Sequence, residues 1–207
     1  MYVRFSQVAG DPQVVSDALR QIEHVVRPAV ETQPGSMGLA LHVTAQPGVV
    51  ILESFWATHE ALRASERAVA PGRGEAALLG GGTVTVELYR LPVFEQDVPG
   101  RGGEGVRLTR MDAEPAVVDD VIEVFGDTFV PWLAETTGFH SALLCADPAS
   151  GRLVSQDIWH DLPALAASAA AARAAVARAR RARSAPCAMR AVQEYVQVFS
   201  SARRPRS

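Results

Sequence analysis

The sequence of 207 residues contains no lysine and no asparagine, so all 20 of its basic residues are arginines. Without lysine the chain can neither form a Schiff base with a carbonyl substrate nor build the lysine-containing phosphate loop of P-loop proteins. Without asparagine, no site in the chain can use an Asn carboxamide. These two absences therefore exclude several classes of mechanism.

Cysteine is scarce, and long apolar runs and excess positive charge are absent. Cys145 and Cys187 are too few for a disulfide framework and lack metal-ligand spacing, which predicts a reduced, cytoplasmic protein. No apolar run approaches the roughly 20 residues of a membrane span, and the N-terminus reads as a strand rather than a signal peptide. The formal net charge is −3. We therefore expect no membrane and no nucleic acid among the partners.

The hydrophobic pattern of the first half predicts alternating strands and helices. A strand at 2–8 is followed by an apolar helical stripe, and two further strands lie at 37–43 and 49–56. A second helix from 60 to about 69, ended by Pro71-Gly72, leads to an alternating strand at 83–89. The resulting order, βαββαβ, is typical of the ferredoxin-like fold.

The second half of the chain repeats the first at an offset of 103 residues. The clearest match is a strand that ends on tryptophan and is followed by x4-Ala-Leu-x2-Ser, which occurs at Trp56 and again at Trp159. The same offset aligns other pairs, including Val3-Arg4 with Val106-Arg107, Pro28 with Pro131, and Gly35 with Gly138. Agreement over two helices and three strands without a gap indicates an internal duplication.

The duplication predicts an α+β protein built from two tandem ferredoxin-like repeats. The expected boundaries are a first repeat at 1–91, a linker at 92–105, a second repeat at 106–200 and a disordered tail at 201–207. A ferredoxin-like sheet has helices on one face only, so its other face must be covered. We expect the two repeats to cover each other as an intrachain dimeric α+β barrel. This pseudo-dimer leaves further homodimerisation open.

The strand-Trp-x4-Ala-Leu-x2-Ser motif, placed after a βαβ unit and a Pro-Gly turn, resembles the antibiotic-biosynthesis-monooxygenase-like group of the dimeric α+β barrel superfamily. The resemblance covers almost the whole chain as a tandem fusion. It implies an oxygenase, a haem-degrading enzyme, an isomerase or a protein without an assigned reaction. Quinone-forming members have an Asn four residues before the Trp, where this chain has Leu52 and Ser155.

Haem-degrading members of the group have a second Trp nine residues after the strand-end aromatic residue. Ser65 and Ser168 occupy these positions here. The resemblance therefore disfavours haem, and it implies either no cofactor or reduced flavin.

The strand that ends at Trp159 carries the strongest candidate for acid–base chemistry. Ser155, Asp157 and Trp159 share one face of it, which should look toward the helices and into a cavity. A buried Asp157 with a raised pKa could act as a general base. The alternative is a carboxylate that is satisfied by an arginine such as Arg107 or Arg110.

Other candidates are aromatic residues and a histidine. Trp159, Trp132 and Phe139 in the second repeat, and Trp56 in the first, could stack a flat ligand, or they could fill the core. His140 could approach the cavity and shuttle a proton, or have a structural role.

The resemblance thus implies a small oxygenase, similar to the family's enzymes of aromatic polyketide tailoring, that acts on a flat aromatic substrate. Asp157 or His140 would deprotonate a phenolic substrate, whose carbanion would then react with O2. We expect one working cavity, in the second half. The alternatives are a cyclase or isomerase that uses the same groups, and a non-catalytic ligand-binding protein.

Overall fold

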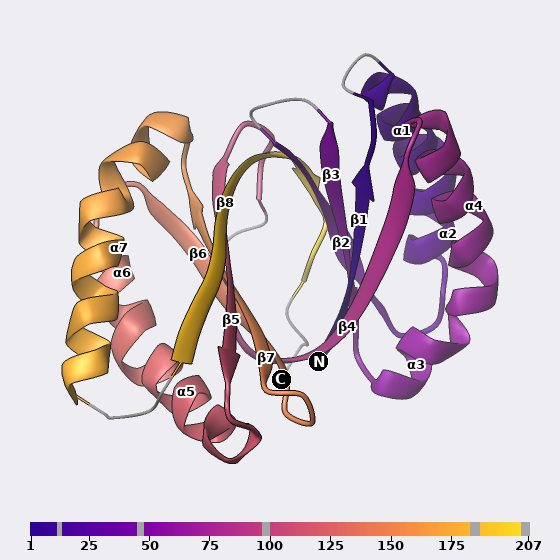
Figure 1. Ribbon diagram of the computed structural model, residues 1–207. Coiled ribbons are helices and arrows are strands. Elements are labelled where there is room, and N and C mark those ends of the chain that lie inside the picture. Colours follow the sequence, from indigo (N-terminus) through magenta and orange to yellow (C-terminus); the bar gives the residue numbers. More distant parts are fainter. Residues whose placement is uncertain (12–13, 45–47, 97–99, 183–186, 204–207) are drawn as a thin grey trace. The chain divides into compact units, whose positions relative to one another are not determined.

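A computed structural model of the chain describes residues 1–11, 14–44, 48–96, 100–182 and 187–203 (Figure 1). The chain forms two compact units, the first built mainly from Met1–Tyr89 and the second mainly from Gly103–Tyr195. In each unit the helices lie on one face of that unit's sheet (Figure 1).

The two units contain the same order of elements. The first contains β1 (Tyr2–Ala9), α1 (Val15–Gln21), η1 (Ile22–Val26), α2 (Arg27–Glu31), β2 (Ser36–Thr44), β3 (Val49–Trp56), α3 (His59–Ala64), α4 (Glu66–Leu79) and the start of β4 (Thr83–Gln96). The second contains β5 (Gly105–Ala113), η2 (Pro115–Val117), α5 (Val118–Val124), η3 (Phe125–Phe129), α6 (Val130–Ala134), β6 (Phe139–Asp147), β7 (Arg152–Trp159), α7 (Leu162–Ala182) and the start of β8 (Cys187–Ser200).

The last strand of each unit contributes residues to both sheets. The hydrogen-bonding order is β4-β1-β3-β2-β8 in the first unit and β8-β5-β7-β6-β4 in the second. This connectivity is the one expected for tandem ferredoxin-like repeats of the dimeric α+β barrel type. The predicted fold class is therefore confirmed.

The offset of 103 residues extends to an irregular feature of the helices. The π-helical turn η1 begins at Ile22, and its counterpart η3 begins at Phe125. Each is followed by a short helix with a proline in its first turn, Pro28 in α2 and Pro131 in α6. Because proline lacks an N–H, it cannot make the usual bond to the preceding turn, and a local change of helical pitch accommodates it.

The helix that was predicted to end at Pro71 continues to Leu79, and this prediction was wrong. The break falls at Ser65 instead, between α3 and α4, and Pro71 lies inside α4. The continuation buries Ala76 and Ala77 against the core of the first unit. Tertiary packing of this apolar face outweighs the hydrogen bond that proline removes.

Pairing in the sheets continues beyond the repeat boundaries expected from the sequence. β4 runs to Gln96 within the segment expected as linker, of which residues 97–99 lie outside the described part of the chain. Its ladder with β6 shifts register between Arg90 and Val93, around Pro92, which has no N–H to donate. In the expected tail, the Ser201 and Arg203 N–H groups bond to β2 carbonyls, and residues 204–207 are not described.

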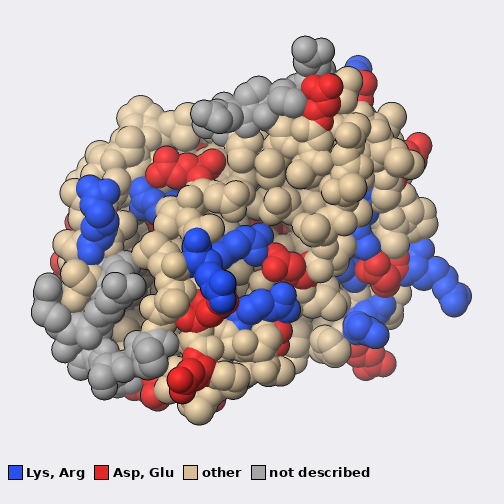
Figure 2. Space-filling view, in the orientation of Figure 1, with Lys and Arg blue, Asp and Glu red and all other residues tan. Residues whose placement is uncertain are grey.

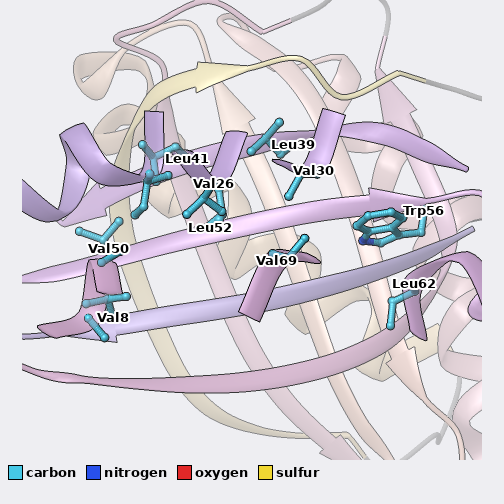
Figure 3. Close-up of a cluster of buried hydrophobic side chains, with 13 residues drawn as sticks. Val8, Val26, Val30, Leu39, Leu41, Val50, Leu52, Trp56, Leu62 and Val69 are labelled. Carbon is cyan, nitrogen blue, oxygen red and sulfur yellow. The ribbon is translucent and has the colours of Figure 1, made fainter. Parts of the chain in front are cut away.

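The core of the first unit lies between its sheet and its helices. Figure 3 shows Trp56 at the end of β3, with Leu62 of α3 and Val69 of α4 facing the same strands. The cluster is completed by apolar side chains of the three neighbouring strands and of η1 and α2, among them Val8, Leu39, Leu41, Val50, Leu52, Val26 and Val30.

A turn that ends in glycine precedes the second strand of each unit, Pro34-Gly35 in the first and Thr137-Gly138 in the second. Each glycine lies against the alanine of the repeated Trp-x4-Ala-Leu-x2-Ser motif. Gly35 has a φ of 77° and Gly138 a φ of 87°. A Cβ on Gly138 would lie 2.7 Å from the Cβ of Ala164, and one on Gly35 would lie 2.6 Å from that of Ala61. The Ala of the motif is thus small because a helix crosses a glycine turn at this point.

Substitution of Gly138 by Ala should destabilise the chain by roughly 2–4 kcal/mol, because it adds left-handed backbone strain to a steric overlap. The matched control is Gly74→Ala in α4, where an added Cβ would meet nothing within 4 Å. That control should gain about 0.5–1 kcal/mol from helix propensity and a stiffer unfolded chain. Urea unfolding of the two variants measures both, and a neutral Gly138→Ala would contradict the packing argument.

Candidate functional site

A cavity of about 510 Å³ lies inside the second unit, between its sheet and its helices. Its floor is formed by β5, β7 and β8, and its walls by α5, η3 and α7. The described residues that line it are Arg107, Thr109, Met111, Val121, Val124, Phe125, Phe129, Ser155, Asp157, Ala169, Ala172, Arg173, Cys187, Met189, Val192 and Glu194.

Most of this lining is apolar. Phe125 and Phe129 of η3 stack with their ring centroids 5.2 Å apart and present aromatic surface. Across from the helices, Met189 and Val192 of β8 line the cavity and are also partly open to solvent, at 44% and 47% exposure. Exposed apolar side chains around a hollow are typical of a ligand-binding site rather than of a closed core.

The polar part of the lining comes from two neighbouring strands in register. Arg107 of β5 lies opposite Asp157 of β7, and Thr109 lies opposite Ser155. Because alternate residues of a strand share a face, both pairs point to the same side of the sheet, toward the helices. The register of β5 and β7 therefore assembles four polar groups on the cavity floor.

The carboxylate of Asp157 is held by two donors. Arg107 Nη1 donates to Asp157 Oδ2 at 2.9 Å, and Trp159 Nε1 donates to the same oxygen at 2.6 Å. The sequence left open whether Asp157 is satisfied by an arginine or faces a cavity. Both hold in the structure, because Asp157 pairs with Arg107 and also lines the cavity.

Arg107 is itself fixed by the repeated motif. Its Nη2 donates to the carbonyl oxygen of Leu165 at 2.9 Å and to Ser168 Oγ at 3.0 Å, and it lies 3.5 Å from Glu194 Oε1. A buried guanidinium is stable only when several acceptors replace the water that it loses. The Leu and Ser of the Ala-Leu-x2-Ser motif supply two of these acceptors.

The environment of Asp157 shifts its acidity. Burial raises the pKa of the Asp157 carboxyl above its ordinary value, and the nearby charge of Glu194 adds to the rise. The charge of Arg107 and the hydrogen bonds from Trp159 and Arg107 oppose it without cancelling it. A carboxylate with a raised pKa is a stronger base than an exposed aspartate.

The first unit has the same arginine motif, but its arginine pairs with the carboxylate of Glu66, at 3.0 Å from Arg4 Nη2, and not with one at the position of Asp157. Arg4 Nη2 donates to the Leu62 carbonyl at 2.6 Å, and Arg4 Nη1 donates to Ser65 Oγ at 3.1 Å. Trp56 Nε1 donates to Ser54 Oγ at 3.0 Å, so Ser54 stands where the second unit has Asp157. The arginine motif is thus present in both units, and only the second unit has a carboxylate at the position of Asp157.

Side-chain size explains why the second unit is hollow. At positions 103 residues apart, Leu52, Glu66 and Val69 of the first unit correspond to the smaller Ser155, Ala169 and Ala172. In the first unit Leu52 and Val69 are buried in the core cluster shown in part in Figure 3. In the second unit all three smaller residues line the cavity.

Two of the seven residues singled out from the sequence, Asp157 and Ser155, line the cavity. His140 does not. Its Nε2 lies 3.5 Å from Glu104 Oε1, and its ring centroid is 6.0 Å from that of His160. This places His140 in a polar cluster outside the cavity lining.

The four aromatic candidates also lie outside the cavity lining. Trp159 is fully buried, and its ring meets that of Phe139 edge to face at 5.6 Å. Trp132 packs on the core of the second unit, 6.5 Å from the ring of Phe129. Trp56 is buried in the core of the first unit. Trp159 reaches the site only through its hydrogen bond to Asp157.

Sequence reasoning missed Glu194, Arg173 and the phenylalanine pair of η3 as parts of one site. Glu194 could have been noticed because it aligns with Glu87 in the last strand of the first repeat. The helical spacing of Phe125 and Phe129 marks one face of a helix but does not say that this face is left uncovered.

Two proteins of Mycobacterium tuberculosis (strain ATCC 25618 / H37Rv) are related to this chain in sequence. The uncharacterized protein Rv2558 is 34% identical over 167 residues, which are 80% of this chain and 71% of that protein. The uncharacterized protein Rv2557 is 31% identical over 165 residues, which are 80% and 74% of the two chains. The chain belongs to the family of these mycobacterial proteins. No protein-family model matches the sequence.

Solved structures share the fold of this family member. A protein of Lactobacillus acidophilus NCFM proposed to be a monooxygenase superposes with a TM-score of 0.69 at 8% identity, over 97% of this chain and 93% of its own. An anthrone oxidase-like protein gives 0.68 at 15%, over 96% and 92%. The haem-degrading enzyme LmHde of Listeria monocytogenes gives 0.54 at 10%, over 95% and 99%. The fold of the antibiotic-biosynthesis-monooxygenase-like group, as a tandem fusion, is thus confirmed.

The hydropathy of the helices and the charge of the surface bear on the partners of this family member. Among the described residues, no helix is both long and apolar enough to cross a membrane. Figure 2 shows arginine and acidic side chains interspersed on the face in view, in keeping with the small formal net charge of −3.

The pH dependence of the free energy of unfolding should reveal the raised pKa of Asp157. Its pKa is raised on folding, so the stability that it contributes is greatest when it is protonated and is lost as pH rises through the raised pKa. Wild type should therefore gain stability relative to Asp157→Asn as pH falls from neutral toward the ordinary value of 3.8. Urea unfolding at a series of pH values measures this difference.

Asp147→Asn is the control of opposite sign. A hydrogen bond from Ser150 lowers the pKa of Asp147, so wild type should keep its stability relative to that variant down to about the ordinary value of 3.8 and lose it as pH falls further. If the difference between wild type and Asp157→Asn did not change with pH, the assigned environment of Asp157 would be wrong.

Proposed function

We propose that this chain is a small oxygenase that acts on a flat aromatic, polyketide-like substrate in the cavity of the second unit. The observation that carries the proposal is a buried carboxylate, Asp157, that is bonded to an arginine and lines a mainly apolar cavity. The cavity volume of about 510 Å³ falls within the range of roughly 300–1,000 Å³ that is common for small-molecule sites.

The shape of the lining supports a flat phenolic molecule. The stacked rings of Phe125 and Phe129 offer an aromatic wall. On the floor, Thr109, Ser155 and Asp157 offer hydrogen-bonding groups to a phenol or carbonyl oxygen. A ligand with apolar rings and one polar edge would bury its rings without leaving a polar group unpaired.

In the proposed mechanism Asp157 is the general base. It accepts a proton from a phenol or from an activated carbon acid, and the electron pair of the broken bond stays on the substrate. The negative charge then moves from Asp157 to a substrate anion beside Arg107, which is well placed to stabilise it. The same arginine thus compensates the charge before and after the proton transfer.

Oxidation follows from the carbanion. Its carbon forms a bond to O2, and the resulting hydroperoxide loses water to give a carbonyl group. In the overall balance, one methylene group and one molecule of O2 give one carbonyl group and one molecule of water, so the carbon is oxidised and O2 is reduced. An apolar cavity suits this step because O2 is itself apolar and water competes less for the carbanion.

We propose that no cofactor is needed, because the substrate carbanion supplies the electrons, and we keep reduced flavin as the alternative. Two observations support a haem-free site. The described residues of the lining include no histidine to ligate haem iron. Ser168, at the position of the second Trp of haem-degrading members, accepts a hydrogen bond from Arg107 instead.

The decisive experiment measures oxygen uptake by the purified chain with a panel of anthrones and naphthols, with and without reduced flavin. Asp157→Asn keeps the shape of the side chain and removes the base, so uptake should fall by about 100-fold or more. The matched control is Ser54→Ala, at the equivalent position of the first unit, which should retain uptake.

Two outcomes would contradict the oxygenase. Conversion of a substrate without oxygen uptake, abolished by Asp157→Asn, would indicate a cyclase or isomerase that uses the same carboxylate. Binding of aromatic compounds without any conversion would indicate a ligand-binding protein.

A third outcome concerns Asp157 alone. Oxygen uptake that survives Asp157→Asn would show that Asp157 is not the general base.

A further inference from the structure

Of the four charged residues in the described cavity lining, three form ion pairs with one another and the fourth does not. Arg107 contacts both carboxylates of the lining, at 2.9 Å to Asp157 and 3.5 Å to Glu194. These three groups therefore form one compensated cluster on the floor. The remaining charged residue of the described lining is Arg173, which projects from α7.

Arg173 has no compensating carboxylate of its own. Within the part of the chain that the structure describes, it forms no ion pair or hydrogen bond, and its side chain is exposed. Ala169 and Ala172 precede it on α7 by four residues and one residue and also line the cavity. Their small side chains leave open space beside Arg173.

Arg173 has no charged counterpart in the first unit. The position 103 residues earlier in the first unit is Ala70 on α4. An arginine thus replaces alanine on the same helix where glutamate and valine, Glu66 and Val69, are replaced by alanine. The changes that create space and the change that adds a charge occur together.

We propose that the cavity binds an aromatic acid, and that Arg173 determines this specificity by pairing with the carboxylate or other anionic group of the ligand. The proposal rests on the proposed function and names the substrate class of that same site. An anion placed elsewhere in the lining would meet apolar side chains, the uncharged hydroxyls of Thr109 and Ser155, or the carboxylates of Asp157 and Glu194. Arg107, which already serves two carboxylates, has little charge left to offer.

The orientation of the ligand follows from this pairing. With its anionic group at Arg173 on the helix and its rings along Phe125 and Phe129, the opposite edge of the ligand reaches the floor of the cavity. The acidic proton to be removed would then lie at Asp157, away from the anionic group. Arg173 thus binds the anionic group of the ligand, whereas Arg107 stabilises the charge that forms during proton transfer.

The test uses two fluorescent probes of nearly equal size, 9-anthracenecarboxylate and the uncharged 9-anthracenemethanol. Fluorescence titration of the full chain should give tighter binding of the carboxylate, and that preference should weaken as salt is raised. Arg173→Gln should weaken carboxylate binding by about tenfold, the loss expected for one charge-assisted hydrogen bond, and leave the alcohol unchanged. Arg173→Lys should restore part of the preference.

The matched control is Arg67→Gln, which removes an exposed arginine from α4 of the first unit and should change neither affinity. Equal binding of the two probes by wild type, or equal losses of both in Arg173→Gln, would overturn the proposal. Failure of both probes to bind would also overturn it. The oxygenase is judged separately, because oxygen uptake with an uncharged anthrone depends on Asp157 and not on Arg173.

Discussion

The buried arginine of the first strand in each unit is the interaction on which the rest of the structure depends. Arg4 and Arg107 each reach from the sheet to the carbonyl of a helix leucine and to a serine one turn later. These bonds fix the helix over the end of the strand that carries the tryptophan. A charge this deeply buried must keep its acceptors, so the helix cannot shift without a large cost.

This constraint lets the two units differ in their interiors. Because the arginine anchors one end of the helix, the side chains further along it can shrink without loss of the fold. In the first unit Val69 is buried in the core and Glu66 pairs with Arg4, whereas the second unit has alanines at both positions and a cavity of about 510 Å³. The two units thus share the arginine anchor and differ in the size of the side chains further along the helix.

The electrostatics of the cavity follow from the same anchor. Arg107 holds the Asp157 carboxylate at the wall of an apolar space, where burial raises its pKa although the arginine stabilises its charge. These opposing effects leave the pKa of Asp157 above its ordinary value, so its carboxylate is a stronger base than an exposed aspartate. The second arginine of the lining, Arg173, is not one of the main causes of the pKa shift of Asp157, and we propose that it pairs with a ligand.

The sequence by itself determined the duplication, the order of elements and the ferredoxin-like fold, because the periodicity of apolar residues and the offset of 103 depend only on local order along the chain. It also singled out Asp157, which lines the cavity, because a carboxylate on a buried strand face is unusual. Only the tertiary structure decided that Trp159, Trp132 and Phe139 pack in the core while Phe125, Phe129, Glu194 and Arg173 meet at one cavity. A cavity is the volume that side chains from several distant elements fail to fill, and no local pattern records that sum.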